Sequence, residues 1–303
     1  MFANRSITLL GIACFSLLTS AAFAQSYRMQ ATVTGLVSEG EYDQFQEDSY
    51  RAGSVDAVVY FSAVELGRGP WEQAAFLNKS GYVGATKVKG TLEREALTQT
   101  ADQNGYRFSN LDDIDVDVEE IYGRGVFANR ITADFSASWR EEAATDSSYE
   151  NDSIGLTVGS YFKQTNWWGF TYKRMQVSHH FEESEHDVSV YGLAARHLML
   201  QESDLGVGVE YGVSWENGRE IDDAWELFSS FTFYLSQRTG VTMGASVRDG
   251  EIYDTGRIDM GVNYFIMPQV AVAVHILARQ LDFPDSSIDY LEEGILFELT
   301  GRL

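Results

Sequence analysis

Residues 205–216 read Leu-Gly-Val-Gly-Val-Glu-Tyr-Gly-Val-Ser-Trp-Glu, so apolar residues occupy every second position and glycine, serine or glutamate lie between them. The same period of two recurs at 241–248, 258–264 and 295–303. Because successive side chains of a β-strand point to opposite faces, this pattern is typical of strands with one apolar and one polar face. Helical spacing is scarce along the chain. The sequence therefore predicts an all-β protein.

A soluble β-sandwich would also alternate, but three features favour a transmembrane barrel. The alternating segments run for about 10 to 15 residues, against about 5–6 in globular sheets. Charged residues such as Glu210 and Asp259 stand in the middle of these segments, on the polar side. Short links such as 127–130 alternate with longer acidic links such as 98–112. Short turns at one end and long loops at the other are typical of outer-membrane β-barrels.

The alternating segments predict about fourteen strands, an even number that places both termini on the periplasmic side of a bacterial barrel. We expect one up-and-down antiparallel β-barrel domain over residues 25–303, with short periplasmic turns and longer acidic extracellular loops. A closed barrel has no unpaired edge strand. That closure suits a chain whose single cysteine is Cys14 and which can form no internal disulfide.

Residues 1–24 predict a cleaved signal peptide. Arg5 supplies a positive charge, residues 7–18 are mostly apolar but too few to span a membrane, and Ala22-Phe23-Ala24 precedes Gln25 with small residues at the cleavage positions. An exported barrel with this leader is expected in the outer membrane of a Gram-negative bacterium. Its first partner there is outer-membrane lipid.

The charge balance argues against one class of partner. The chain has 22 Lys+Arg against 45 Asp+Glu, a formal net charge of −23. Such an acidic protein repels nucleic acid phosphates, so no nucleic acid partner is expected.

Tryptophans gather where the predicted strands end. Amphipathic aromatic rings favour the lipid headgroup level, so two such groups predict two interfacial belts. The expected interface aromatics are Trp167 and Trp168 at the short-turn ends and Trp139, Trp215 and Trp225 near the long-loop ends.

Charged residues on the polar side of the strands are expected to line a pore and set its selectivity. These residues are Asp134, Glu210, Glu226, Arg248, Arg257, Asp259, Glu298 and Arg302. In a further segment Asp115, Asp117 and Glu119 alternate with Val116 and Val118. There we expect the valines to face lipid and the three acids to line the lumen or the pore mouth, with a purely solvated loop as the alternative.

No catalytic or metal-binding motif emerges. Asp113, Asp115 and Asp117 open like a calcium loop, but Val118 stands where glycine is needed and Arg124 where glutamate is needed. His179, His180 and His186 lie among acids that could hold a transition metal, yet adjacent histidines on a strand point to opposite faces. We expect a solvated acidic loop there, no metal, no cofactor and no enzymatic activity, since G-x-S-x-G is also missing from the sequence.

One segment is more specific: Gly67-Arg68-Gly69-Pro70-Trp71-Glu72-Gln73-Ala74-Ala75-Phe76-Leu77-Asn78-Lys79-Ser80. It resembles the general porin family of Gram-negative bacteria, in which a Gly-Pro turn and an Ala-Ala-Phe-Leu segment follow the first hairpin. The residues from Trp71 to Leu77 can form one amphipathic helical turn at the periplasmic rim, with Pro70 at its start. The chain departs from such barrels in ending on Leu303 rather than an aromatic residue. Leu303 keeps the outward parity of Phe297 and Leu299, so the C-terminal strand is still expected to engage the outer-membrane assembly machinery.

The pattern and the resemblance together predict a passive, water-filled porin for small hydrophilic solutes. The acidic excess predicts a preference for cations. The alternative is a barrel that transports nothing and acts as a structural or surface-binding protein. A lipid transporter is less favoured, because such proteins usually need an N-terminal plug and only Gln25 and Ser26 precede the first predicted strand.

Overall fold

The computed structural model describes residues 26–42, 46–66, 69–96, 113–128, 130–144, 148–163, 165–179, 184–201, 205–218, 223–250, 254–282 and 289–303. The predicted signal peptide lies outside these residues. Among the described residues, no helix has the length and apolar character needed to cross a bilayer.

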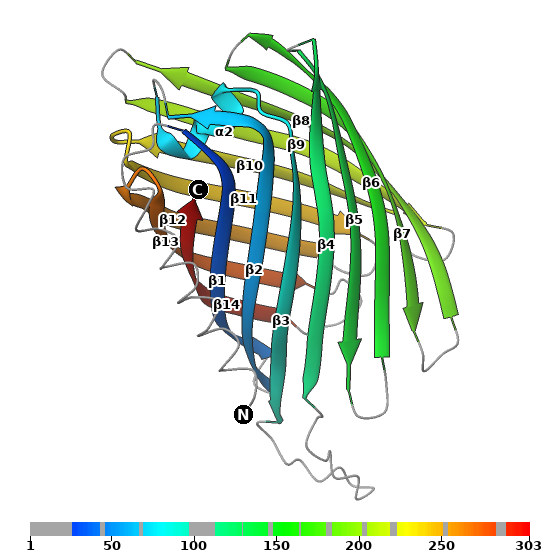
Figure 1. Cartoon of the computed structure of the whole chain (residues 1–303). Helices are drawn as coiled ribbons and strands as arrows, with labels where there is room; N and C mark the ends of the chain where they lie inside the picture. Colours follow the sequence, from blue (N-terminus) through cyan, green and yellow to red (C-terminus); the bar gives the residue numbers. More distant parts are fainter. Residues whose placement is uncertain are drawn as a thin grey trace, which may run out of the picture.

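Fourteen antiparallel strands in the described part of the chain close into one barrel, in which each strand pairs with its sequence neighbours and β1 pairs with β14 (Figure 1). This confirms the predicted all-β, fourteen-stranded, up-and-down architecture. The strands are β1 (Ser26–Tyr42), β2 (Gln46–Glu65), β3 (Tyr82–Ala96), β4 (Ile114–Phe127), β5 (Ile131–Ala143), β6 (Ser148–Lys163), β7 (Asn166–His179), β8 (Ser184–Leu200), β9 (Gly206–Gly218), β10 (Ala224–Tyr234), β11 (Thr239–Gly250), β12 (Asp254–Met267), β13 (Val270–Asp282) and β14 (Asp289–Arg302).

The outer face of the barrel is apolar. Residues directly opposite each other in an antiparallel ladder share a face, so Leu193, Val213, Leu227 and Val247 form one row across β8 to β11. Leu193, Leu227 and Val247 are each about half exposed. A soluble monomer rarely exposes a continuous apolar surface of this kind. It is typical of a barrel wall that faces lipid.

The two ends of the barrel differ in their links. At one end, here named the short-turn end, tight connections join β4 to β5, β6 to β7, β10 to β11 and β12 to β13. Both ends of the described chain lie there, since Arg28 N donates a 2.7 Å hydrogen bond to the carbonyl oxygen of Leu303. At the opposite end, the long-loop end, most connecting residues lie outside the described part of the chain.

The link between β2 and β3 is the exception at the short-turn end. It contains a 3-10 turn, η1 (Trp71–Gln73), and one turn of α-helix, α2 (Ala74–Leu77), which Figure 1 shows close to the β1–β2 end of the barrel. We name its described residues, Leu66 and 69–81, the plug. Gly69 begins the turn into it with φ +106°, a conformation that favours glycine.

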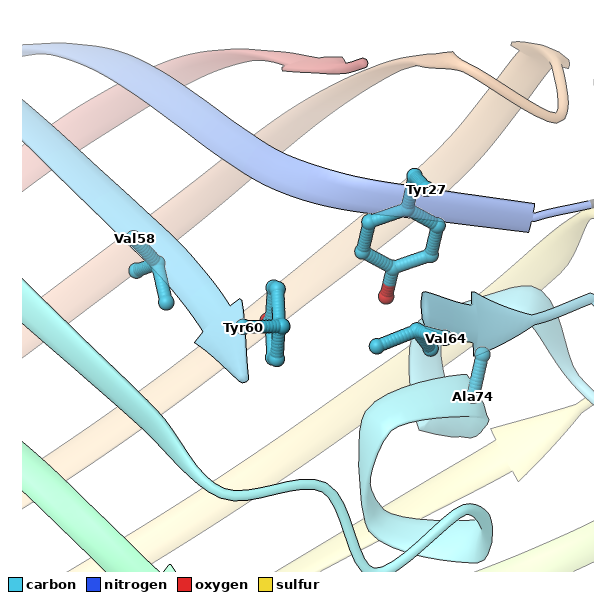
Figure 2. Close-up of a cluster of buried hydrophobic side chains, with 5 residues drawn as sticks. All are labelled: Tyr27, Val58, Tyr60, Val64 and Ala74. Carbon is cyan, nitrogen blue, oxygen red and sulfur yellow. The ribbon is translucent and has the colours of Figure 1, made fainter. Parts of the chain in front are cut away.

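The predicted helical turn is therefore present, and Pro70 precedes it as expected. Its position is not the rim. Ala74 and Phe76 are buried against inner-face residues of the barrel. Figure 2 shows Ala74 beside Tyr27, Tyr60 and Val64, which come from β1 and β2. The apolar face of the turn packs against the inside of the barrel end and is shielded from water there. This packing stabilises the turn, because so short a helix has little stability of its own.

Candidate functional site

The barrel interior is the candidate site, and hydrogen bonds between the plug and the wall identify which side chains face it. The Arg196 guanidinium on β8 donates to the Gln73 side-chain oxygen, and the Gln73 amide donates to the Tyr234 hydroxyl on β10. Arg302 Nη1 on β14 donates a 2.9 Å hydrogen bond to the Trp71 carbonyl oxygen. Strands from different sides of the barrel thus point these side chains at one central segment.

Aromatic contacts extend the plug to further strands. The ring of Phe76 lies 5.4 Å from that of Tyr161 on β6, and the Arg196 guanidinium lies 4.6 Å from the Phe76 ring centroid. The ring of Trp71 meets Phe265 on β12 edge to face at 5.8 Å. The plug therefore crosses the lumen at the short-turn end and contacts the wall on several sides.

One ionisable group belongs to the plug itself. Burial raises the pKa of the Glu72 carboxyl, although Arg196 and Arg302 act in the opposite direction and Glu298 adds to the rise. Its carboxylate reaches β11, where Oε2 lies 3.0 Å from the position that a Cβ would take at Gly240. Burial in the plug thus disfavours the charge that Glu72 would carry in water at neutral pH.

The ladder register places all eight predicted pore-lining residues on the inner face. The residues are Asp134, Glu210, Glu226, Arg248, Arg257, Asp259, Glu298 and Arg302. Their effect on selectivity stays a prediction.

Three of the eight are tied to neighbours. Asp134 accepts two hydrogen bonds from Arg124, from Nε at 2.6 Å and from Nη2 at 2.8 Å. Arg248 Nη2 lies 3.0 Å from the Glu216 carboxylate. Arg302 is buried beneath the plug, where its guanidinium stacks on the rings of Tyr27 and Phe265. The inner face therefore holds fixed ion pairs as well as charges that point into the lumen.

Asp115, Asp117 and Glu119 lie on the outer face, contrary to the prediction. Glu119 is directly opposite the exposed Trp139, and it accepts a 2.6 Å hydrogen bond from Lys87 of β3. Asp117 pairs with Lys87 and with Lys89, the latter at 3.2 Å. Because these acids and lysines neutralise each other beyond the apolar part of β4, apolarity no longer marks the lipid side there.

The valines between those acids face inward. Val116 is buried and lies opposite Glu142. Taking β4 in the wrong phase also hid two inner-face residues, Glu120 and Arg124, whose parity follows that of Tyr122. Ile121 and Phe127, on the other parity and exposed, are the sequence signal that could have revealed the correct phase.

The predicted interface aromatics divide between the two faces. Trp139, Trp168, Trp215 and Trp225 lie exposed on the outer face. Trp167 does not: it is 7% exposed against 50% for Trp168, and its indole nitrogen donates a 3.0 Å hydrogen bond to Thr132 Oγ1 on the inner face. Adjacent strand residues point to opposite faces, so the two tryptophans could not both face the interface.

The histidine-rich segment is described only in part. His180 and the side chain of His179 lie outside the described residues, while His186 is opposite Val177 on β7. Within the described ranges, no group of three or more His, Cys, Asp or Glu side chains could hold a metal ion.

No protein-family model and no curated protein matches this chain in sequence. Solved structures do match in fold. The outer membrane protein Omp33 of Acinetobacter baumannii is 14% identical, with 93% of this chain and 100% of that chain covered and a TM-score of 0.51. The toluene transporter TbuX of Ralstonia pickettii is 10% identical, with 91% and 90% covered and a TM-score of 0.59.

A third match is the toluene transporter TodX of Pseudomonas putida, 8% identical over 93% of this chain and 90% of that one, with a TM-score of 0.55. At such low identities the likeness concerns the fold alone. It does not establish membership of the general porin family, to which residues 67–80 show only a resemblance. The chain has the closed-barrel fold that an outer membrane protein and two transporters share.

Proposed function

We propose that this chain is an outer-membrane channel for small hydrophilic solutes whose periplasmic end is closed, in this conformation, by the plug. One observation carries the proposal: a closed barrel with an apolar outer face and a charged inner face. That combination suits a wall between lipid and water. The transporters among the fold neighbours, and the resemblance of residues 67–80 to general porins, support the same function.

The location follows from the same features. We place the short-turn end on the periplasmic side, because single-chain bacterial barrels have both termini and their short turns there. Export through the predicted signal peptide 1–24 and assembly through β14 complete the proposal. Phe297 and Leu299, both exposed on the outer face, give β14 the apolar signal for assembly.

The inner face favours hydrophilic over hydrocarbon solutes. Two of the fold neighbours are named toluene transporters, yet here charged side chains such as Glu210, Asp259 and Arg257 point inward. A charge in a confined, partly desolvated lumen is costly unless water or a polar solute accompanies it. We therefore infer a water-filled path from the long-loop end to the plug.

The plug also favours a second candidate, a barrel that transports nothing. Recordings from the purified protein in a planar lipid bilayer separate the two. A channel with a closing plug should show discrete openings, even if they are rare. A folded, heat-modifiable barrel without openings, and without openings after the plug is weakened, would favour a structural or surface-binding role.

We retain cation preference as part of the proposal. The described residues show ion pairs for Asp134 and Arg248 but none for Glu210 or Asp259. These two carboxylates are therefore available to attract cations from the lumen. The test is the reversal potential under a salt gradient. Glu210→Gln with Asp259→Asn should move it toward zero, whereas Glu119→Gln on the outer face should not. An anion-selective sign in the unmodified protein would overturn the preference.

A further inference from the structure

A recess opens in the inner wall where β4, β5, β6 and β7 lie side by side. One registered row across these strands consists of Tyr122, Ser136, Gly155 and Lys173. The two middle residues are small, so the wall recedes between a tyrosine and a lysine. A cavity of about 430 Å³ lies over this row.

Gly155 keeps the floor of the recess open. A Cβ at that position would lie 2.9 Å from Ser136 Oγ and 3.7 Å from Lys173 Cγ. A larger side chain would displace the lysine stem and occupy the cavity. Glycine is therefore the residue that gives the recess its depth.

Most polar groups around the recess already have partners within the wall. Arg124 binds Asp134 through two hydrogen bonds. The hydroxyls of Thr157 and Thr171 lie 2.8 Å apart. The Tyr122 hydroxyl donates to Asp56 of β2. These contacts hold the walls in place and leave little for a ligand to satisfy.

Glu120 and Lys173 are different. Both line the cavity, both are half-buried, and within the described chain neither forms a hydrogen bond or an ion pair. Lys173 is the positive charge that acts electrostatically on Glu120, but the two groups do not come within ion-pair distance of each other. The recess thus presents a carboxylate and an ammonium group separated by open space.

We propose that this recess binds a small zwitterion of the α-amino acid class, with its ammonium group on Glu120 and its carboxylate on Lys173. Charge-assisted hydrogen bonds to both ends would replace the water that these two half-buried groups now require. A neutral sugar would gain less, because most of the hydroxyls that could bind it, and the Arg124–Asp134 pair, already have partners within the wall. The inference deepens the proposed channel function and rests on it for a purpose in transport.

The recess also lies against the plug. Tyr82 and Tyr122 line the cavity, and both pack on the buried cluster that contains Tyr60 of β2 and Ala74 of the plug. A bound solute would therefore be held immediately on the long-loop side of the plug. A solute bound there would be next to the plug and would be released when the periplasmic end opens.

The test is calorimetric titration of the purified full-length barrel in detergent at low salt, with L-alanine as the probe. Acetate, methylammonium and glucose serve as comparison ligands that carry only one of its charges or neither. We expect saturable binding of alanine in the millimolar range and no saturable binding of the other three. Glu120→Gln and Lys173→Gln should each weaken alanine binding about tenfold or more, since each removes a charged partner. Gly155→Val should abolish it by filling the floor.

The matched controls are Glu292→Gln and Arg279→Gln, an acid and a base opposite each other on the inner face of β13 and β14. They should bind alanine as the unmodified protein does. Three results would overturn the inference. They are binding of glucose or acetate with the same affinity as alanine, unchanged alanine binding in both recess variants, and no binding of alanine by the unmodified protein. Because titration needs no transport, alanine binding by a barrel that never conducts would support the recess and refute the channel.

Discussion

The guanidinium of Arg302 donates a 2.9 Å hydrogen bond to the carbonyl oxygen of Trp71, which ties the last strand of the barrel to the link between its second and third strands. The same guanidinium donates to the Gln30 side chain and stacks between Tyr27 and Phe265. One buried cation therefore joins both chain ends of the barrel to the plug. If the plug must move for solutes to pass, this is a contact that has to break.

Arg302→Gln should open the channel more often. The substitution removes a charge-assisted hydrogen bond and two ring contacts from the closed state, a loss of about 1.5–3 kcal/mol if the open state lacks them. The open fraction in bilayer recordings should rise about tenfold or more, since each 1.4 kcal/mol is a factor of ten. Arg279→Gln, on the inner face away from the plug, is the control. A folded Arg302→Gln barrel that opens no more than the unmodified protein would refute this role.

A disulfide should lock the plug. Trp71 N donates a 3.0 Å hydrogen bond to the Gln237 carbonyl oxygen in the β10–β11 turn, so the two residues are adjacent. Trp71→Cys with Gln237→Cys should form a disulfide, because the hydrogen bond holds the two backbones side by side and such a bond needs Cα atoms only about 4.4–6.8 Å apart. Channels with the disulfide should stay closed, and reduction should allow them to open again. The conductance of each single-cysteine variant should not change when reductant is added. Equal conductance before and after reduction, with the disulfide verified by mass spectrometry, would show that the plug does not gate the pore.

Channel opening should depend on pH through Glu72. The pKa of this carboxyl is raised in the closed plug, mainly by burial, above the 4.5 that it has in water. A raised carboxyl pKa favours the closed state when the group is protonated, and that advantage is lost as pH rises through the raised value. The open fraction should therefore increase between about pH 5 and about pH 8. Glu72→Gln should stay mostly closed at both pH values, and a Gln variant with the original pH dependence would assign the effect to another group.

Lipid contact should distinguish two adjacent tryptophans. Trp168 is on the outer face, whereas Trp167 lies inside, hydrogen-bonded to Thr132 with the Arg124 guanidinium 5.3 Å from its ring. In vesicles of brominated phospholipid, Trp168→Phe should lose part of the quenchable fluorescence and Trp167→Phe should lose none. The Trp167 variant should also lower the free energy of unfolding by about 1 kcal/mol, the usual loss for one buried hydrogen bond. Equal loss of quenching in the two variants would contradict the assigned faces.

Alternation in the sequence was sufficient to predict the barrel. The period of two in residues 205–216 predicts that Val213 lies on the outer face, where it pairs with Leu227. The strand count follows from the repetition of that pattern between turns. Strand parity is a local property, because each side chain is opposite in direction to its neighbour. The same alternation correctly predicts that Glu210, Asp259 and Arg302 lie on the inner face, because this prediction does not depend on which strands pair with theirs.

The predicted faces were wrong where the direction of a side chain depends on a neighbouring strand and not on the local sequence. In β4, Val116 is inward and Asp117 outward, since a pair of lysines on the neighbouring strand neutralises the outward acids. Which neighbour a strand meets, and at what register, is a property of the sheet and not of the segment. The same holds for Trp167, whose polar partner belongs to another strand.

The plug shows the limit most clearly. The sequence alone determined that Trp71 to Leu77 would turn into a short helix after Pro70, because that depends on neighbours in the chain. The entry of the turn into the lumen depends instead on the folded barrel, where it meets Arg196, Tyr234 and Arg302, residues more than a hundred positions away. Those contacts exist only once the barrel has closed, because closure alone brings β8, β10 and β14 around one segment and excludes the water that would otherwise compete for them.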